Sequence, residues 1–175
     1  GIKTKDAEYP LDIIIFATGF DAMTGSLLKM DIQGRDGLTL KDYWQAGPRN
    51  YLGLQVPGFP NMFTITGPGS PSVLCNLPPA IEQHVNWITD CIRTLRDQGL
   101  QRIEATEQAS DEWCAEVNRA ADATLLGKVK HSWYLGANVP GKPQVFMPYA
   151  GGFGHYTQIC NQVAQDNYKG FSLSR

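Results

Sequence analysis

The sequence has 175 residues, of which 42% are hydrophobic and 18% are charged, and its formal net charge is −2. This composition is typical of a globular protein and excludes a disordered chain. The charge balance, without a basic run, argues against a nucleic-acid partner, which needs clustered Lys and Arg side chains. The longest apolar run, residues 13–17, is far shorter than the roughly 20 residues that cross a bilayer, so we expect no membrane partner.

The cysteines and histidines show no spacing typical of a reactive or metal-binding site. The four cysteines lie far apart, with no C-x-x-C pair: Cys75, Cys91, Cys114 and Cys160. We expect free thiols in a protein of the reducing cytoplasm rather than disulfides or metal ligands. No histidine has a second ligand at metal-binding spacing, so the sequence predicts no metal site. It also shows no nucleophile motif and no paired carboxylates, so it predicts no catalytic residue within the chain.

The first predicted element is a buried strand at residues 11–17. It reads Leu-Asp-Ile-Ile-Ile-Phe-Ala and runs into the motif Ala-Thr-Gly-Phe-Asp at 17–21. Continuous apolar strands of this kind form the interior of parallel sheets, which need neighbouring strands. No βαβ unit precedes the strand, so we expect the chain to be the back part of a larger protein. Gly19 then lies either in a crevice at the carboxyl end of the strand or in an ordinary turn.

A second strand is predicted at residues 61–66, after a tight turn at 33–37. It leads into a Gly-Pro-Gly-Ser-Pro-Ser loop at 67–72, which lacks the last glycine of a dinucleotide-binding fingerprint. Two interpretations stay open. Gly67 and Gly69 let the backbone approach a flat ligand, or they belong to a rigid turn that binds none.

Three helices are predicted, at residues 78–98, 111–126 and 155–167. The first begins with two prolines, which suit a first helical turn, and the positive end of its dipole suits a carbonyl group or an anion. Its predicted buried stripe is Ile81, Val85, Ile88, Ile92 and Leu95, with His84 at the boundary. The second helix is predicted to be capped by Ser110 and to bury Trp113, Val117, Ala121 and Leu125. The third is predicted to bury Ile159 and Val163.

The segment 128–154 is irregular and rich in Gly, Pro and aromatic residues. A long loop of this kind within a compact chain is usually functional or mobile. Trp133 offers a ring for stacking and an N–H donor, and Asn138 offers an amide, so both are suited to read the edge of a cofactor. The alternative is that Trp133 anchors the loop in the core.

Three motifs occur in a characteristic order along the chain. They are residues 17–21, the loop 67–72 followed by Ile-Glu-Gln-His-Val at 81–85, and Gly-Ala-Asn-Val-Pro-Gly-Lys at 136–142. Together they resemble the C-terminal third of Baeyer–Villiger monooxygenases, and most closely the phenylacetone and cyclohexanone monooxygenase group. The resemblance runs over essentially the whole chain. It implies a parent enzyme that uses FAD, NADPH and O2 to insert one oxygen atom into a ketone, giving an ester or lactone.

The resemblance implies an α/β fold. The chain would be the C-terminal fragment of a flavoprotein monooxygenase with two Rossmann-like, dinucleotide-binding domains, and its own C-terminal part would be mostly helical. Residues 1–50 would end the NADPH-binding domain and lead back to the FAD domain. Residues 51–175 would be the C-terminal part of the FAD-binding domain, with a control-loop-like segment at 128–154. Because the glycine fingerprints for both cofactors are missing, we expect the fragment alone to be inactive and not to retain FAD or NADPH.

The matching motifs also imply site residues. By position, Asn76, Leu77 and Pro78 would lie near the flavin ring, and Trp133 would contact NADP. The ketone pocket would be lined by Ser72, Val73 and Leu74. Two other functions stay open: a non-enzymatic remnant or assembly module that self-associates through faces exposed by truncation, and a fragment of a monooxygenase that oxidises nitrogen or sulfur.

Overall fold

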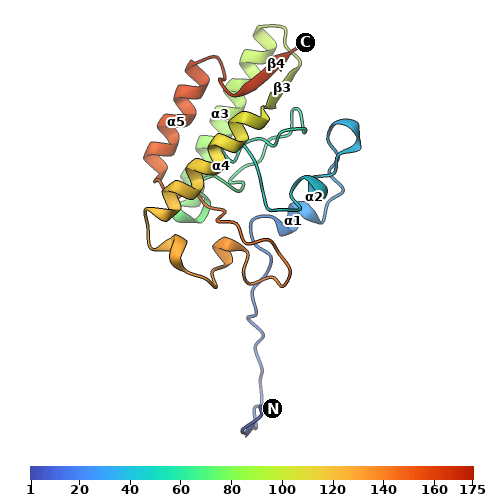
Figure 1. Cartoon of the computed structure of the whole chain (residues 1–175), viewed down its shortest axis with the longest axis vertical. Coiled ribbons are helices and arrows are strands. Elements are labelled where there is room, and N and C mark those ends of the chain that lie inside the picture. Colours follow the sequence, from blue (N-terminus) through green and yellow to red (C-terminus); the bar gives the residue numbers. More distant parts are fainter.

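The computed structural model describes residues 1–175 and shows a helical body with a long N-terminal arm (Figure 1). The arm ends in a small antiparallel hairpin of β1 (Ile2–Lys3) and β2 (Glu8–Tyr9). The C-terminus lies at the opposite end of the molecule. No helix combines the length and the hydrophobicity that crossing a bilayer requires. The four cysteines are free thiols, as predicted, and Cys91 and Cys160 are buried.

Residues 11–17 do not form the predicted strand. They run as an extended arm without regular structure, and their apolar side chains face solvent: Ile13, Ile15 and Phe16 are 79%, 85% and 82% exposed. The strand prediction is therefore wrong for this chain. A strand is stabilised by hydrogen bonds to its neighbours, and no other segment of the chain pairs with this one.

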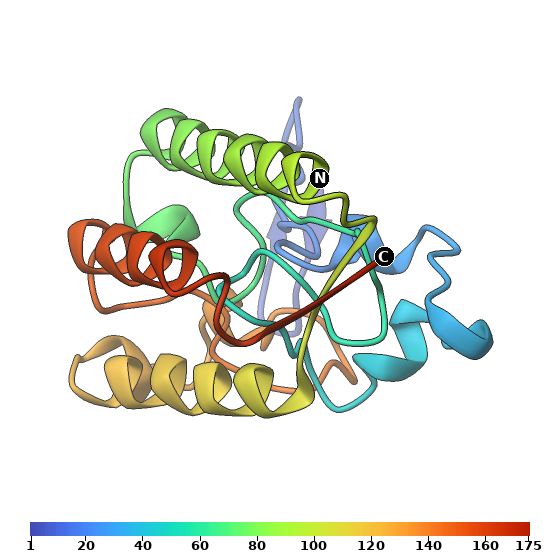
Figure 2. The same ribbon diagram turned by 90° about the horizontal axis from the view of Figure 1, so that it is seen from above.

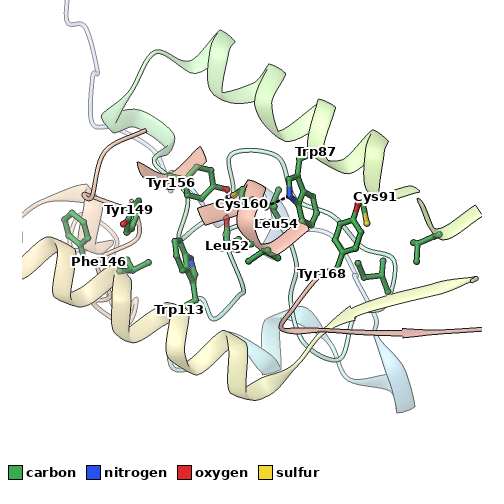
Figure 3. Close-up of a cluster of buried hydrophobic side chains, with 14 of the residues drawn as sticks. Leu52, Leu54, Trp87, Cys91, Trp113, Phe146, Tyr149, Tyr156, Cys160 and Tyr168 are labelled. Atoms are coloured by element: carbon green, nitrogen blue, oxygen red, sulfur yellow. Dashed lines mark hydrogen bonds between the residues drawn. The ribbon is translucent and has the colours of Figure 1, made fainter. Parts of the chain in front are cut away.

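The body is built from three long helices that surround an irregular segment, residues 48–70 (Figure 2). They are α3 (Leu77–Asp97), α4 (Glu107–Asp122) and α5 (Phe153–Gln165). All three confirm predicted helices, and the mixed helix and sheet content agrees with the expected class. The main core lies between the helices and the segment that they enclose (Figure 3). Large members of this core are Leu52, Leu54, Trp87, Trp113, Tyr149 and Tyr156.

The helix α4 differs from its prediction at both ends. It begins at Glu107 because the side chain of Thr106, rather than that of Ser110, accepts the hydrogen bond of a capping residue, from the N–H of Ala109 at 3.2 Å. Ser110 lies inside the helix and is fully buried. The helix ends at Asp122, and the predicted core residue Leu125 lies beyond this end with its side chain 78% exposed. The other predicted core positions of α4 are buried.

The helix α3 buries a different face from the predicted one. Its buried residues are Ala80, His84, Trp87, Cys91 and Leu95. Of the predicted stripe, only Leu95 is buried and Ile88 is partly buried, while Ile81, Val85 and Ile92 are 41%, 42% and 54% exposed. The helix carries two apolar stripes, and periodicity alone does not tell which of them faces the core. His84, predicted at the boundary, is 1% exposed.

A two-stranded antiparallel sheet closes the C-terminal end of the body, and the sequence did not predict it. β3 (Arg102–Ala105) pairs with β4 (Phe171–Ser174). Two side-chain amides occupy the other edge of β3. Gln55 accepts from the N–H of Ala105 at 2.9 Å and donates to the carbonyl of Ile103 at 3.3 Å. Asn61 accepts from the N–H of Ile103 and donates to the carbonyl of Gln101, each at 3.0 Å.

The predicted strand 61–66 is reduced to one isolated bridge between Phe63 and Gln55. The prediction fails because Asn61 and Thr66 have φ angles of 60° and 51°, and this left-handed backbone interrupts a strand at both ends. The predicted turn at 33–37 is confirmed, since Gln33 pairs with Thr39 across it.

Two short helices, α1 (Gly25–Leu28) and α2 (Leu40–Tyr43), lie beside the body (Figure 1). A small second core holds α2 against the irregular segment 48–70. Its members are Leu40, Trp44, Val56 and Phe59. This core joins residues from both sides of the predicted domain division at 50/51. The division itself stays a prediction.

Candidate functional site

An open groove of about 610 Å³ brings together four of the seven predicted site residues: Ser72, Val73, Leu77 and Trp133. It lies between α1, the start of α3 and the short 3-10 helix η4 (Trp133–Leu135). Nine of its 14 lining residues are hydrophobic, and no charged side chain lines it. A concave, mostly apolar site of this size is typical of small-molecule pockets.

The other three predicted residues lie outside the lining. Leu74 packs, partly buried, against the main core. Asn76 precedes the first turn of α3 without a side-chain capping bond, and Pro78 lies in that turn; both are exposed. The structure thus places Asn76 and Pro78 next to the groove residue Leu77 along the chain. Their predicted roles stay predictions.

One wall of the groove was not found by sequence reasoning. It comes from residues 20–27 and includes Met23 and Leu27. The hydroxyl of Ser72 lies 3.3 Å from the sulfur of Met23, so this wall contacts the predicted ketone-pocket residues directly. The motif at 17–21 indicated a possible crevice close to this wall. It did not predict α1, which has only four residues and no periodic pattern.

The loop 67–72 is a buried, internally bonded turn. Ser70 donates from its hydroxyl to the carbonyl of Gly67 at 2.7 Å, and the indole N–H of Trp113 donates to the carbonyl of Gly69 at 3.0 Å. At Gly69, where φ is 84°, an added Cβ would lie 2.7 Å from Asn50 Oδ1. Internal packing therefore requires this glycine, which favours the rigid-turn interpretation at Gly69. Gly67 lines the groove.

His84 fixes the position of one groove residue through a buried hydrogen-bond chain. The N–H of Thr66, which lines the groove, donates to Nδ1 of His84 at 2.8 Å. The neutral ring then carries its proton on Nε2, which donates to the hydroxyl of Tyr156 at 2.7 Å. That hydroxyl donates to the carbonyl of Leu52 at 2.6 Å. Burial lowers the pKa of His84 to about 4, so the neutral ring that this chain of bonds requires is the stable form.

The start of α3 offers few hydrogen-bond donors to a ligand. Pro78 and Pro79 have no N–H, and the N–H of Ala80 donates to the carbonyl of Asn76 at 3.3 Å. Leu77 therefore supplies the one backbone N–H of this turn that the chain does not use itself. A phosphate group needs several convergent N–H donors. The geometry suits a neutral carbonyl better than an anion.

The segment 128–154 folds back against the body. The N–H of Met147 donates to the carbonyl of Tyr134 at 2.9 Å, and the amide of Asn138 donates to the carbonyl of Phe20 at 3.0 Å. Asn138 thus bonds within the chain rather than presenting a free amide to a cofactor. Trp133 is 38% exposed and lines the groove, so it is not the core anchor of the alternative interpretation.

Comparison with known proteins finds relatives over almost the whole chain. It is 46% identical over 176 residues to acetone monooxygenase (methyl acetate-forming) of Gordonia sp. (strain TY-5) and 44% identical over 169 residues to a Baeyer–Villiger monooxygenase of Pseudooceanicola batsensis. It is 41% identical over 174 residues to phenazine N-monooxygenase of Lysobacter antibioticus. These matches cover 99%, 96% and 99% of this chain but 33%, 30% and 32% of the relatives. No protein-family model matches the chain.

Solved structures agree with these relatives. The chain superposes on an oxidised steroid monooxygenase bound to NADP with a TM-score of 0.89 and 52% identity. It superposes on the complex of OTEMO with FAD and NADP with a TM-score of 0.91 and 41% identity. Each match covers 99% of this chain and 32% of the other. By sequence and by fold, this chain is a segment of a Baeyer–Villiger monooxygenase and spans about one third of the length of the relatives that it matches.

Proposed function

We propose that the chain forms one wall of the flavin and ketone pocket of an FAD- and NADPH-dependent Baeyer–Villiger monooxygenase. In this proposal the parent enzyme inserts one oxygen atom of O2 into a ketone and releases an ester or lactone. The observation that carries it is the groove in which Ser72, Val73, Leu77 and Trp133 meet. Residues predicted for the ketone pocket and for the two cofactors share this one apolar depression, although Trp133 is distant from the others in sequence.

The residues present fit part of the cofactors only. The groove has an apolar lining without charged side chains, which suits a flat ring system and a ketone. Dinucleotide phosphates need convergent N–H donors or basic groups, and the start of α3 provides a single free N–H. We therefore propose that this chain contacts the ring ends of FAD and NADPH and that other parts of the parent hold the phosphates. When bound, FAD supplies the oxygen chemistry and NADPH supplies the electrons.

Within this proposal the chain's own residues position the substrate and exclude water. Val73 provides apolar surface beside Ser72, Leu74 anchors this segment to the main core, and Trp133 borders the groove from the loop side. The positive end of the α3 dipole, near Leu77, favours the partial negative charge of a carbonyl oxygen. Asn76 and Pro78 fix the shape of this helix start next to the flavin ring.

The test is a chimera with the relative from Gordonia, to which the chain aligns over 176 residues. The corresponding segment of acetone monooxygenase is replaced by this chain, and the purified protein is assayed with ketones under ¹⁸O2. We expect a yellow, FAD-bound protein that forms an ester with one labelled oxygen atom. A matched pair, Val73→Trp and the exposed variant Arg102→Gln on β3, separates filling of the groove from general damage. Only Val73→Trp is expected to lower kcat/KM, by about 100-fold.

A chimera that binds FAD and consumes NADPH but forms no ester from any ketone would overturn the ketone proposal. A chimera that forms ester equally well with Val73→Trp would overturn the assignment of the groove. The isolated chain is expected to lose FAD on desalting. Retention of a flavin absorption band would contradict the proposal that other parts of the parent hold the phosphates of FAD.

A second candidate is oxidation at nitrogen, because the chain is 41% identical to phenazine N-monooxygenase over 99% of its length, the same identity and coverage as to cyclohexanone 1,2-monooxygenase. The same chimera assayed with an aromatic N-heterocycle and a thioether distinguishes this from ketone oxidation. An N-oxide or sulfoxide as the main product, without ester, would favour the second candidate.

A third candidate is a module that associates without catalysis. It is supported by the exposed apolar side chains of the arm and of α3, including Ile15, Phe16 and Ile92. Light scattering of the 175-residue chain over a dilution series tests it. A mass that stays that of a monomer at high concentration would contradict self-association.

A further inference from the structure

A partly buried ion pair beside the groove joins two segments that are far apart in sequence. The ammonium group of Lys142 contacts the Oδ1 atom of Asp21, and it lies 3.5 Å from the carbonyl of Ala22. The side chain of Lys142 is 10% exposed and that of Asp21 is 31% exposed. Ala22 itself lines the groove. The pair therefore lies next to a wall of the groove and is only partly exposed to solvent.

The surrounding backbone is shaped to hold this pair. Asp21 rests against the first residue of α1, since a Cβ added to Gly25 would lie 2.6 Å from Cβ of Asp21. Gly136, with a φ of 75°, lies over the Lys142 side chain, and a Cβ there would lie 2.9 Å from Cδ of Lys142. A second bond, from the amide of Asn138 to the carbonyl of Phe20, links the same two segments as the ion pair. Both connections join the segment 133–142 to the segment 20–22.

We propose that Asp21 and Lys142 are positioning residues that hold Trp133 at the groove. The segment that carries Trp133 is joined to the segment 20–22 through this pair and through Asn138, so the ion pair is placed to set whether this side of the groove is closed. The inference rests on the proposed function for its effect on cofactor binding, but its structural part does not. A substrate or cofactor that enters from the loop side then requires this pair to separate.

Desolvation predicts an asymmetry between variants of the pair. With Asp21→Asn, closing the loop buries most of the Lys142 side chain with the carbonyl of Ala22 nearby but no opposite charge, which is unfavourable, so the loop opens. With both Asp21→Asn and Lys142→Met, no charge is buried, and the long apolar side chain still packs under Gly136, so the loop closes again. A pair that served only as a weak surface contact would show neither the opening nor the recovery.

Hydrogen exchange of the 175-residue chain tests the proposal without any cofactor. The probes are the amides of Val145 and Met147, which donate to the carbonyls of Leu135 and Tyr134 and so connect the Trp133 turn to the rest of the chain. We expect Asp21→Asn to speed their exchange about tenfold while the amides of α3 stay unchanged, and the double variant to return to within about twofold of the wild type. The matched control is Lys130→Met, which removes an exposed lysine from the same loop.

Exchange in Asp21→Asn that equals that of Lys130→Met would overturn the proposal. If Asp21→Asn does not fold, the reversed pair Asp21→Lys with Lys142→Asp takes its place, and failure of this reversed pair to protect the same amides overturns the proposal. In the chimera, Asp21→Asn is expected to release NADP⁺ about tenfold faster, with recovery in the double variant. If amide exchange is faster but NADP⁺ release is not, the effect on the cofactor is overturned and the positioning role of the pair stands. Absence of ester formation in the unaltered chimera would count against the proposed function alone.

Discussion

The Nε2 atom of His84 on α3 lies 2.7 Å from the hydroxyl of Tyr156 on α5, and both side chains are almost fully buried. The two residues are 72 positions apart in sequence, and their bond connects the two helices across the main core. At its far ends the same chain of bonds reaches the N–H of Thr66 and the carbonyl of Leu52. One groove residue thus depends on a polar connection that runs through the centre of the molecule.

The variant Tyr156→Phe is expected to lower the free energy of unfolding by about 2–4 kcal/mol. It keeps the ring but leaves the carbonyl of Leu52 and the Nε2 proton of His84 without a partner in the core. Urea titration followed by circular dichroism measures the change. The exposed tyrosine variant Tyr9→Phe is the control and should change stability by less than about 0.5 kcal/mol. Equal stabilities for the two variants would contradict the role of this hydroxyl.

His84 is expected to make the stability fall in mild acid. Its pKa is about 4 in the folded chain, below its ordinary value of 6.5, because burial disfavours the charged ring. The unfolded chain therefore binds a proton as the pH falls below 6.5 while the folded chain does not, and the stability is lost progressively between pH 6.5 and about 4. Between pH 7 and pH 5 this amounts to about 2 kcal/mol. The difference in pH dependence between the wild type and His84→Gln measures it, and identical slopes would contradict it.

The exposed stripe of α3 is expected to govern association of the isolated chain. Replacing Ile81 and Val85 by Lys places charges on the outer face of the helix, where both side chains are more than 40% exposed. We expect the free energy of unfolding to change by less than about 1 kcal/mol while the mean mass at high concentration falls toward that of a monomer. Light scattering makes the comparison, with Glu82→Gln as a control on the same helix. Association that persists unchanged would locate the contact elsewhere, for example on the arm.

Trp133 is expected to contribute to NADP⁺ binding in the chimera without contributing to stability. Its indole N–H has no hydrogen-bond partner within the chain and its side chain is 38% exposed, so Trp133→Phe removes a donor that the fold does not use. We expect the affinity for NADP⁺ to fall about tenfold with an unchanged melting temperature. Equilibrium titration measures it, and Tyr134→Phe serves as the neighbouring control. A lower melting temperature of Trp133→Phe alongside its lower affinity for NADP⁺ would indicate that Trp133 acts through packing instead.

The long helices could be predicted from the sequence because each carries a strong periodic pattern with a clear start or end. What failed is the choice of face in α3, where two apolar stripes compete and only the large ring of Trp87 identifies the inner one. The strands failed for another reason. Strand formation depends on distant partners, and residues 11–17 have none within the chain, whereas the pairing of β3 with β4 joins segments that are remote in sequence.

The family motifs singled out four residues that the structure brings together in one groove. Ser72, Val73, Leu77 and Trp133 line one groove, while their roles toward substrate and cofactors stay predictions. The wall that contains Met23 could not be predicted, because a helix of four residues leaves no periodic signal. The pairing of Asp21 with Lys142 could not be predicted either. Each residue lies in a recognised motif, but neither motif indicates which residue the other contacts.

The amides of Gln55 and Asn61 have a consequence for the behaviour of the chain in solution. They bond the outward-facing N–H groups of Ile103 and Ala105 and the carbonyls of Gln101 and Ile103, so this edge of β3 is a poor template for a segment from a second molecule. The protection matters here because the same chain carries a bare, β-branched stretch at Ile13, Ile14 and Ile15 that is chemically suited to such cross-molecular pairing. Intermolecular strand exchange through this edge is thereby disfavoured by two neutral side chains.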